Sequence, residues 1–147
     1  MIKIICVGKI KEKFYRDAID EYTKRLSKYT KLEIIEVNDE EINSLEKEKE
    51  NILKVINKKD YIITLEIEGT MLNSIDFSKK IQNTLSINPN ITFIIGGSNG
   101  LHHEIKDISN YKISFSLLTF PHQLFRVILL EQIYRSYKII NNETYHK

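Results

Sequence analysis

The chain has 147 residues, of which 41% are hydrophobic and 29% are charged, and its formal net charge is +2. Disordered chains are poorer in aliphatic residues, and no apolar run here is long enough for a membrane span or a secretory signal, so these classes are excluded. We therefore expect one globular domain, residues 1–147, in the cytoplasm, and the near balance of charges does not by itself indicate nucleic acid.

The first half of the chain predicts two strands, each followed by a helix. Residues 2–7 are apolar and rich in β-branched side chains, which favours a buried strand in which Cys6 acts as a small hydrophobe. Residues 12–29 carry apolar side chains about every fourth position, as in an amphipathic helix. Residues 32–37 return to strand character, and the highly charged residues 38–59 predict a surface helix.

The second half continues this alternation. Strands are expected at residues 61–67, 91–95 and 111–115, and helices are expected to begin near Ser74 and Leu101. Several strands are apolar on both faces. Five such strands alternating with helices are typical of an α/β fold, a parallel sheet flanked by helices on both sides.

The last predicted helix combines apolar and charged residues. Pro121 disfavours helical geometry for the residue before it, so a helix can begin immediately after it. Residues 124–140 are apolar on most sides, which predicts burial in a core or against another subunit. Arg126, Glu131 and Arg135 are costly to bury unless they are paired. Glu131 and Arg135 can pair four residues apart, whereas Arg126 has no such partner in the sequence.

A glycine-rich stretch, residues 96–100, lies between a predicted strand and a predicted helix, where a parallel sheet can bind a ligand. It lacks the spacing of a dinucleotide fingerprint and the lysine of a phosphate loop, and a tight turn is the simpler interpretation. The four histidines do not show the spacing of metal ligands, so we expect no metal site.

Two polar features have more than one interpretation. Lys9, Lys11 and Lys13 cluster after the first strand, where they could contact phosphate or form a solvated surface. His122 follows Pro121 at a helix start, where it could be a catalytic base or a structural group.

Several motifs, in order along the whole chain, resemble the ribosomal RNA large subunit methyltransferase H family. The motifs that carry the resemblance are residues 64–69 (Thr-Leu-Glu-Ile-Glu-Gly), 93–101, 119–126 (Thr-Phe-Pro-His-Gln-Leu-Phe-Arg), 131–135 and 145–147, and residues 7–14 fit as well. One departure is the stretch 141–144 (Asn-Asn-Glu-Thr), where a glycine is common in the family.

The resemblance implies a fold, a cofactor and an assembly. The family belongs to the SPOUT class, which implies a parallel sheet with a C-terminal deep trefoil knot, binding of S-adenosyl-L-methionine, and a homodimer. Physical rules of chain connection disfavour knots, so the knot is implied by the resemblance alone. The implied cofactor-binding residues are Leu65, Gly96, Phe115, Ser116, Leu117, Leu118, Thr119 and Phe120.

The reaction that the resemblance implies is N3-methylation of a pseudouridine in 23S ribosomal RNA on the assembled ribosome. An imide nitrogen is nucleophilic only once it has lost its proton. We hypothesise that Tyr145 and His146 close over the base, and that His146 or a water bound to it takes the proton. Arg126 and Arg135 would hold phosphate or stabilise the anionic base, and His122 would orient the cofactor loop.

Three alternative functions are open at this point. A related SPOUT enzyme could act on transfer RNA, and a noncatalytic protein with this fold could bind ribosomes without turnover. A dinucleotide-dependent oxidoreductase could also use a parallel sheet, but the missing glycine spacing argues against it.

Overall fold

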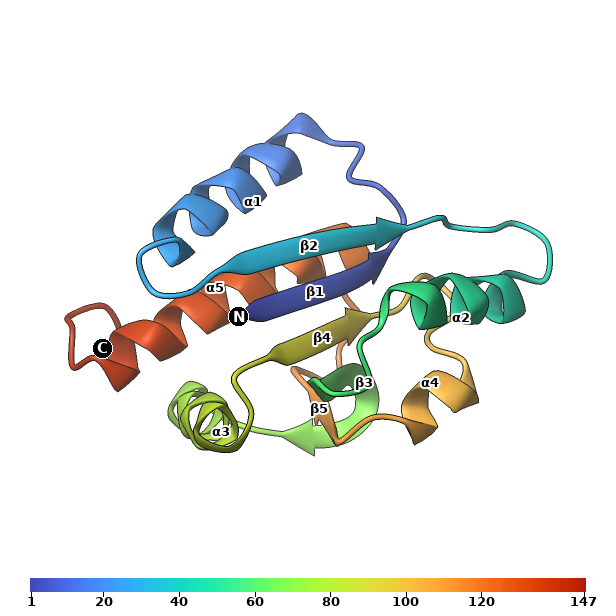
Figure 1. Ribbon diagram of the computed structural model, residues 1–147. Helices are drawn as coiled ribbons and strands as arrows, with labels where there is room; N and C mark the ends of the chain where they lie inside the picture. Colours follow the sequence, from blue (N-terminus) through green and yellow to red (C-terminus); the bar gives the residue numbers. More distant parts are fainter.

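A single five-stranded parallel sheet organises the computed structural model, which describes residues 1–147 (Figure 1). The strands are β1 (Ile2–Val7), β2 (Leu32–Val37), β3 (Tyr61–Met71), β4 (Ile91–Ile95) and β5 (Tyr111–Ser114). They lie in the order β2-β1-β4-β3-β5, and every neighbouring pair is parallel. The parallel α/β sheet predicted from the apolar strands is therefore confirmed.

Helices cover both faces of this sheet. They are α1 (Lys13–Leu26), α2 (Ser44–Val55), α3 (Ser74–Ile87), α4 (His103–Asp107) and α5 (His122–Ile140). Helices α1, α3 and α5 pack on one face, and α2 and α4 pack on the other (Figure 1). The longest, α5, begins directly after Pro121, as predicted. None of the five helices combines the length and the apolar character that a membrane crossing requires.

Alternate residues of the central strands face opposite layers, because successive side chains of a strand point to opposite faces. In β1, Ile4 belongs to a cluster of 17 buried residues beneath α1, α3 and α5. Its neighbour Ile5 belongs to a cluster of 8 buried residues beneath α2 and α4. Burying each such side chain contributes about 1.5–3 kcal/mol, so an unbroken apolar strand is stable only where both faces are covered.

Strands β3 and β5 pair in two registers. Ile113 lies opposite Leu65 and also opposite Thr70, so residues 66–69 leave the ladder between them. Gly69 permits this close return, since a Cβ there would lie 2.6 Å from the carbonyl carbon of Ile113. The sequence predicts a strand that ends at residue 67, but β3 continues to Met71, because the glycine allows a bulge and a return to the ladder.

Candidate functional site

A cavity of about 360 Å³ opens at the carboxyl ends of β3, β4 and β5. Its walls come mainly from residues 65–68, where β3 leaves the ladder, from residues 96–101 after β4, and from residues 113–120 at the end of β5 and after it. Ligands of parallel α/β proteins bind at this edge of the sheet, because loops from neighbouring strands converge there.

The cavity gathers most of the residues predicted to bind the cofactor. Seven of the eight line it: Leu65, Gly96, Phe115, Ser116, Leu118, Thr119 and Phe120. The eighth, Leu117, does not line the cavity, and the residue is 72% exposed. His122 at the start of α5 also lines it.

The glycine-rich segment is both a tight turn and a wall of the cavity. The amide of Gly100 donates to the carbonyl of Gly97 at 3.0 Å, and Gly100 has a φ of 75°, in the left-handed region. A Cβ on Gly96 would lie 2.5 Å from the carbonyl oxygen of Gly100. The turn therefore requires glycine at position 96 for space and favours it at position 100 for backbone conformation.

Aromatic and acidic side chains give the cavity its chemical character. The Phe115 ring packs edge-on against Phe125, with 5.2 Å between centroids, and Phe120 stacks on Phe125 at 6.2 Å. Glu66 and Glu68, from the segment that leaves the β3 ladder, also line it. Lys106 also lines the cavity and lies 3.7 Å from Glu66, so Glu68 is the carboxylate without a cationic partner. The cavity thus combines an apolar wall with one unpaired carboxylate, a lining that suits an aromatic ligand carrying positive charge.

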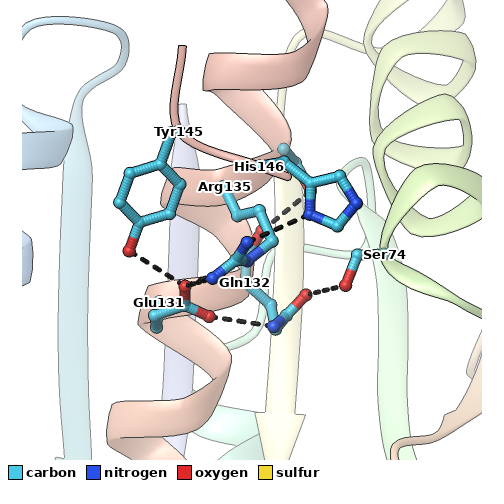
Figure 2. A network of polar contacts seen from close by, with 7 residues as sticks. Ser74, Glu131, Gln132, Arg135, Tyr145 and His146 are labelled. Carbon is cyan, nitrogen blue, oxygen red and sulfur yellow. Dashed lines mark hydrogen bonds and ion pairs between the residues drawn. The ribbon is translucent and has the colours of Figure 1, made fainter.

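A second polar assembly, which we call the C-terminal network, lies on the later part of α5 (Figure 2). Glu131 Oε1 accepts hydrogen bonds from Arg135 Nε at 3.0 Å and Nη2 at 2.6 Å, so the pair predicted from the spacing is confirmed. The same oxygen accepts from the Tyr145 hydroxyl at 3.0 Å. Arg135 Nη1 lies 3.0 Å from Nδ1 of His146. The chain's last residues are therefore held against α5.

The network continues to α3 through residues that the sequence does not single out for function. Gln132 Nε2 donates to Glu131 Oε2 at 2.8 Å, and the Ser74 hydroxyl donates to Gln132 Oε1 at 2.8 Å (Figure 2). Ser74 was expected to cap α3, but Asn73 accepts the amide of Asp76 in that role. Because the cap lies one residue earlier, the Ser74 hydroxyl is free to bond Gln132.

Tyr145 is protonated at neutral pH. Burial, and then the hydrogen bond to Glu131, raise the pKa of its phenol to about 12. The Arg135 guanidinium lies 4.7 Å from the centre of the Tyr145 ring. Tyr145 therefore acts as a hydrogen-bond donor to Glu131 and as an aromatic surface for Arg135.

Arg126 stands apart from both assemblies. Its side chain is 1% exposed, its Nη1 donates to Glu36 Oε2 at 2.6 Å, and its Nη2 donates to the Gly8 carbonyl at 3.2 Å. Its Nε has no partner. Arg126 does not line the cavity, and in this arrangement it joins α5 to the ends of β1 and β2.

Within one chain, the cavity and the C-terminal network do not meet. Arg135, Tyr145 and His146, which were predicted to be catalytic, come together, but none of them lines the cavity. A second hollow of about 380 Å³ lies between the two assemblies. It shares Phe115 and Phe120 with the cavity and is bounded by Ser74 and Gln132 of the network.

A cluster of two histidines and a glutamate at the start of α4 brings potential metal ligands together. His102, His103 and Glu104 place potential ligand atoms within 4.8 Å of one another. Both ring nitrogens of His102 are already bonded, one to Glu46 at 3.0 Å and the other to the amide of Glu104 at 3.1 Å, so this histidine has no free position for a metal.

In the lysine cluster after β1, Lys13 pairs with Asp17 at 2.7 Å. Lys9 and Lys11 are exposed on the loop. Lys9 and Lys11 are therefore the two lysines of this cluster that are available for contact with phosphate.

Comparison with known proteins shows which family the chain resembles. The model of a family described as "Predicted SPOUT methyltransferase" matches residues 1–146. The chain is 58% identical to a protein of Methanococcus maripaludis, and 99% of each chain is covered. It is 53% identical to the ribosomal RNA large subunit methyltransferase H of Clostridium tetani, over 99% of each chain, and 49% identical to that of Caldicellulosiruptor saccharolyticus, over 100% of each.

Among solved structures, a probable methylase family protein from Haemophilus influenzae Rd KW20 has a similar fold. The TM-score is 0.60 at 14% identity, and the match covers 99% of this chain and 70% of the other. At this identity the likeness concerns the fold alone.

Proposed function

The chain belongs to the SPOUT methyltransferase family, and from this premise we propose that it methylates N3 of a pseudouridine in 23S ribosomal RNA on the assembled ribosome. The methyl donor would be S-adenosyl-L-methionine. Full-length relatives named as ribosomal RNA large subunit methyltransferases support the substrate class. The observation that carries the proposal is the cavity at the carboxyl edge of the sheet, lined by seven of the eight residues expected to bind the cofactor. The family also implies the deep trefoil knot.

The size of the cavity and an acidic residue in its wall support the assignment of S-adenosyl-L-methionine as its ligand. A volume of about 360 Å³ lies within the range of small-molecule sites, roughly 300–1,000 Å³. Backbone groups of residues 96–101 and 115–120 would hold the adenine and methionine parts. Glu66 is paired with Lys106, so Glu68 is the carboxylate that would favour the positively charged sulfonium and amino groups. When bound, the cofactor would supply an electrophilic methyl group.

The chain's own groups must position the base and stabilise the charge that forms on it. Loss of the N3 proton leaves an imide anion, which cationic and hydrogen-bond-donating groups stabilise. Arg135 and His146, held by the C-terminal network, are the groups that we assign to this task. His122 lines the cavity and is assigned to orienting the cofactor loop. Arg126, buried against Glu36, would act indirectly by holding the segment after β1.

We further propose a homodimer in which the C-terminal network of one protomer reaches the cavity of its partner. His122 lines the cavity, and Arg135 lies 13 residues further along α5, which corresponds to roughly 20 Å of helix. A second copy would remove this separation. Exposed apolar residues are available for such contact, among them Leu118 in the cavity wall, its neighbour Leu117, and Phe14 on α1.

The proposal is tested by incubating the protein and S-adenosyl-L-methionine with unmodified ribosomes, free 23S ribosomal RNA and transfer RNA. Each RNA is then digested and its nucleosides are identified by mass spectrometry. Methyl-pseudouridine from ribosomes alone is the expected result. Equal modification of free 23S RNA would overturn the requirement for the ribosome. Methylation of transfer RNA alone would mean that transfer RNA, not ribosomal RNA, is the substrate. Cofactor binding without transfer to any RNA would refute the enzymatic proposal.

Deletion of residues 145–147 supplies the matched variant. We expect it to abolish methyl transfer while cofactor binding is kept, because these residues do not line the cavity. Full activity of the shortened protein would remove the C-terminal residues from the mechanism.

A further inference from the structure

His146 is held by a partner that can only donate hydrogen bonds. Its Nδ1 lies 3.0 Å from Arg135 Nη1, and a guanidinium has five N–H donors, no acceptor and a proton that it does not lose in proteins. His146 Nδ1 must therefore be the acceptor. In the neutral imidazole the proton is then on Nε2.

The groups behind Arg135 fix this arrangement. Arg135 donates twice to Glu131 Oε1, and the other carboxylate oxygen of Glu131 accepts from Gln132 (Figure 2). Gln132 is itself held by Ser74 of α3. Arg135 and Glu131 are 24% and 18% exposed, so the pair is only partly solvated. The hydrogen bond to His146 therefore comes from an oriented donor.

No other member of the network is available to accept a proton from substrate. Arg135 is a cation, and the Tyr145 hydroxyl donates to Glu131. Glu131 Oε1 already accepts three hydrogen bonds, two of them from Arg135, and Oε2 accepts one from Gln132. Of the charged groups in the network, Arg135 contacts His146 directly, and Glu131 lies behind Arg135.

We propose that His146 serves the reaction as a hydrogen-bond donor through Nε2–H, and that it is not the base that removes the N3 proton. This inference rests on the proposed function and revises the role first assigned to His146. Its Nε2–H would donate to a carbonyl oxygen beside N3, where part of the negative charge of the imide anion resides. Oriented donors aimed at developing charge are an effective form of transition-state stabilisation.

The methyl transfer can be written without a base among residues 145–147. N3 releases its proton to a solvent water, and its electron pair remains on the imide. That pair forms the new bond to the methyl carbon while the carbon–sulfur bond breaks and its electrons go to sulfur. Arg135 and the Nε2–H of His146 keep their protons throughout.

The tautomer can be measured without RNA. In protein labelled with ¹⁵N-histidine, we expect the neutral His146 ring to show an unprotonated Nδ1 and a protonated Nε2, with its signals assigned by their loss in His146→Gln. Arg135→Met is the matched control, because it removes the donor and should allow the Nδ1–H form to appear. A neutral His146 with its proton on Nδ1 in the native protein would overturn the inference.

The role is tested by single-turnover transfer to ribosomes with His146→Gln, His146→Glu and His146→Ala. Glutamine offers an N–H donor but is no base, whereas glutamate is a base without a donor at neutral pH. We expect His146→Gln to stay within about tenfold of the native rate and the other two to lose about 100-fold, the size found when one oxyanion donor is removed. All variants should keep the native dependence of rate on pH.

The result that contradicts the donor role is a glutamate variant faster than the glutamine variant, or a pH profile that loses an ionisation when His146 is replaced. The two proposals fail differently. If the native protein transfers no methyl group to any RNA, the proposed function fails, and the tautomer measurement still decides the hydrogen-bond assignment of His146.

Discussion

Arg126 and Glu36 are 90 residues apart in the sequence, yet Nη1 of the arginine lies 2.6 Å from Oε2 of the glutamate. The arginine is 1% exposed, and its Nε has no hydrogen-bond partner. Glu36 also accepts the amide of Ile10 at 3.1 Å. This one carboxylate therefore neutralises a buried charge and holds the segment that follows β1.

Replacing Glu36 should be more damaging than replacing both partners. Glu36→Leu leaves the Arg126 charge buried without compensation, and we expect the free energy of unfolding to fall by about 3 kcal/mol. The double variant Glu36→Leu/Arg126→Leu should lose less, because no charge is left buried. Urea unfolding measures both. As a control, Asp17→Ala breaks the exposed pair with Lys13 and should cost less than about 1 kcal/mol. Equal losses for the single and double variants would contradict this account.

The two ends of the glycine turn should differ in their tolerance of side chains. Gly96→Ala forces a Cβ against the Gly100 carbonyl oxygen, so we expect binding of S-adenosyl-L-methionine, measured by calorimetry, to weaken at least about tenfold. Gly100→Asn is the matched control, since a Cβ there meets nothing within 4 Å and asparagine tolerates a positive φ. Unchanged binding by Gly96→Ala would separate this turn from the ligand.

Cys6 should be unreactive until the protein unfolds. It lies in β1 with 1% of its surface exposed, and burial raises the pKa of its thiol to about 12. Thiolates, not thiols, attack disulfide reagents, so we expect no reaction with an aromatic disulfide at pH 8 in the native state. One equivalent should react rapidly in guanidinium chloride. Rapid reaction of native protein would mean that β1 opens locally.

Docking of the C-terminal residues should weaken at high pH. The pKa of Tyr145 is raised from its ordinary value of 10.0 to about 12 in the folded chain. Between these values the folded state binds more protons than the unfolded state, so the contribution of Tyr145 to stability is complete below pH 10 and is lost as the pH rises through 12. Ultraviolet titration of native protein against Tyr145→Phe should show one phenol ionising near pH 12. Titration of that phenol near pH 10 would place Tyr145 in solvent.

Mixed protomers should recover activity that neither variant has alone. One variant lacks residues 145–147, and the other carries Gly96→Ala and is assayed at a cofactor concentration too low to fill its altered cavity. If each network serves the partner's cavity, an equal mixture should regain about a quarter of native activity, since half of randomly paired symmetric dimers are mixed and each has one complete site. Sedimentation should first establish that mixed dimers form. An inactive mixture of mixed dimers would confine each network to its own chain.

Local signals in the sequence predict much of this structure. The β-branched runs place the strands, because buried parallel strands require apolar residues on both faces. The spacing of Glu131 and Arg135 predicts their ion pair, because helical geometry alone brings them together. The cofactor-binding set comes from the family resemblance, and seven of its eight residues line one cavity.

What the sequence could not supply depends on contacts between distant segments. The partner of Arg126 is on β2, and no local pattern identifies it. The glycine at position 69 indicates the end of a strand, yet the structure uses it to return the chain to the ladder. Ser74 and Gln132 resemble ordinary surface residues until α3 and α5 are brought side by side.

The division of the core between two faces affects how the chain folds during synthesis. The cluster beneath α2 and α4 has its last member at Ile105, whereas the larger cluster needs side chains of α5 up to Tyr137. At translation rates of ~5–20 residues per second, the 32 residues from 105 to 137 take roughly two to six seconds. For that interval α5 is missing from the face that α1 and α3 cover only in part, and this face still exposes isoleucine and phenylalanine. That exposed face is where a chaperone would bind.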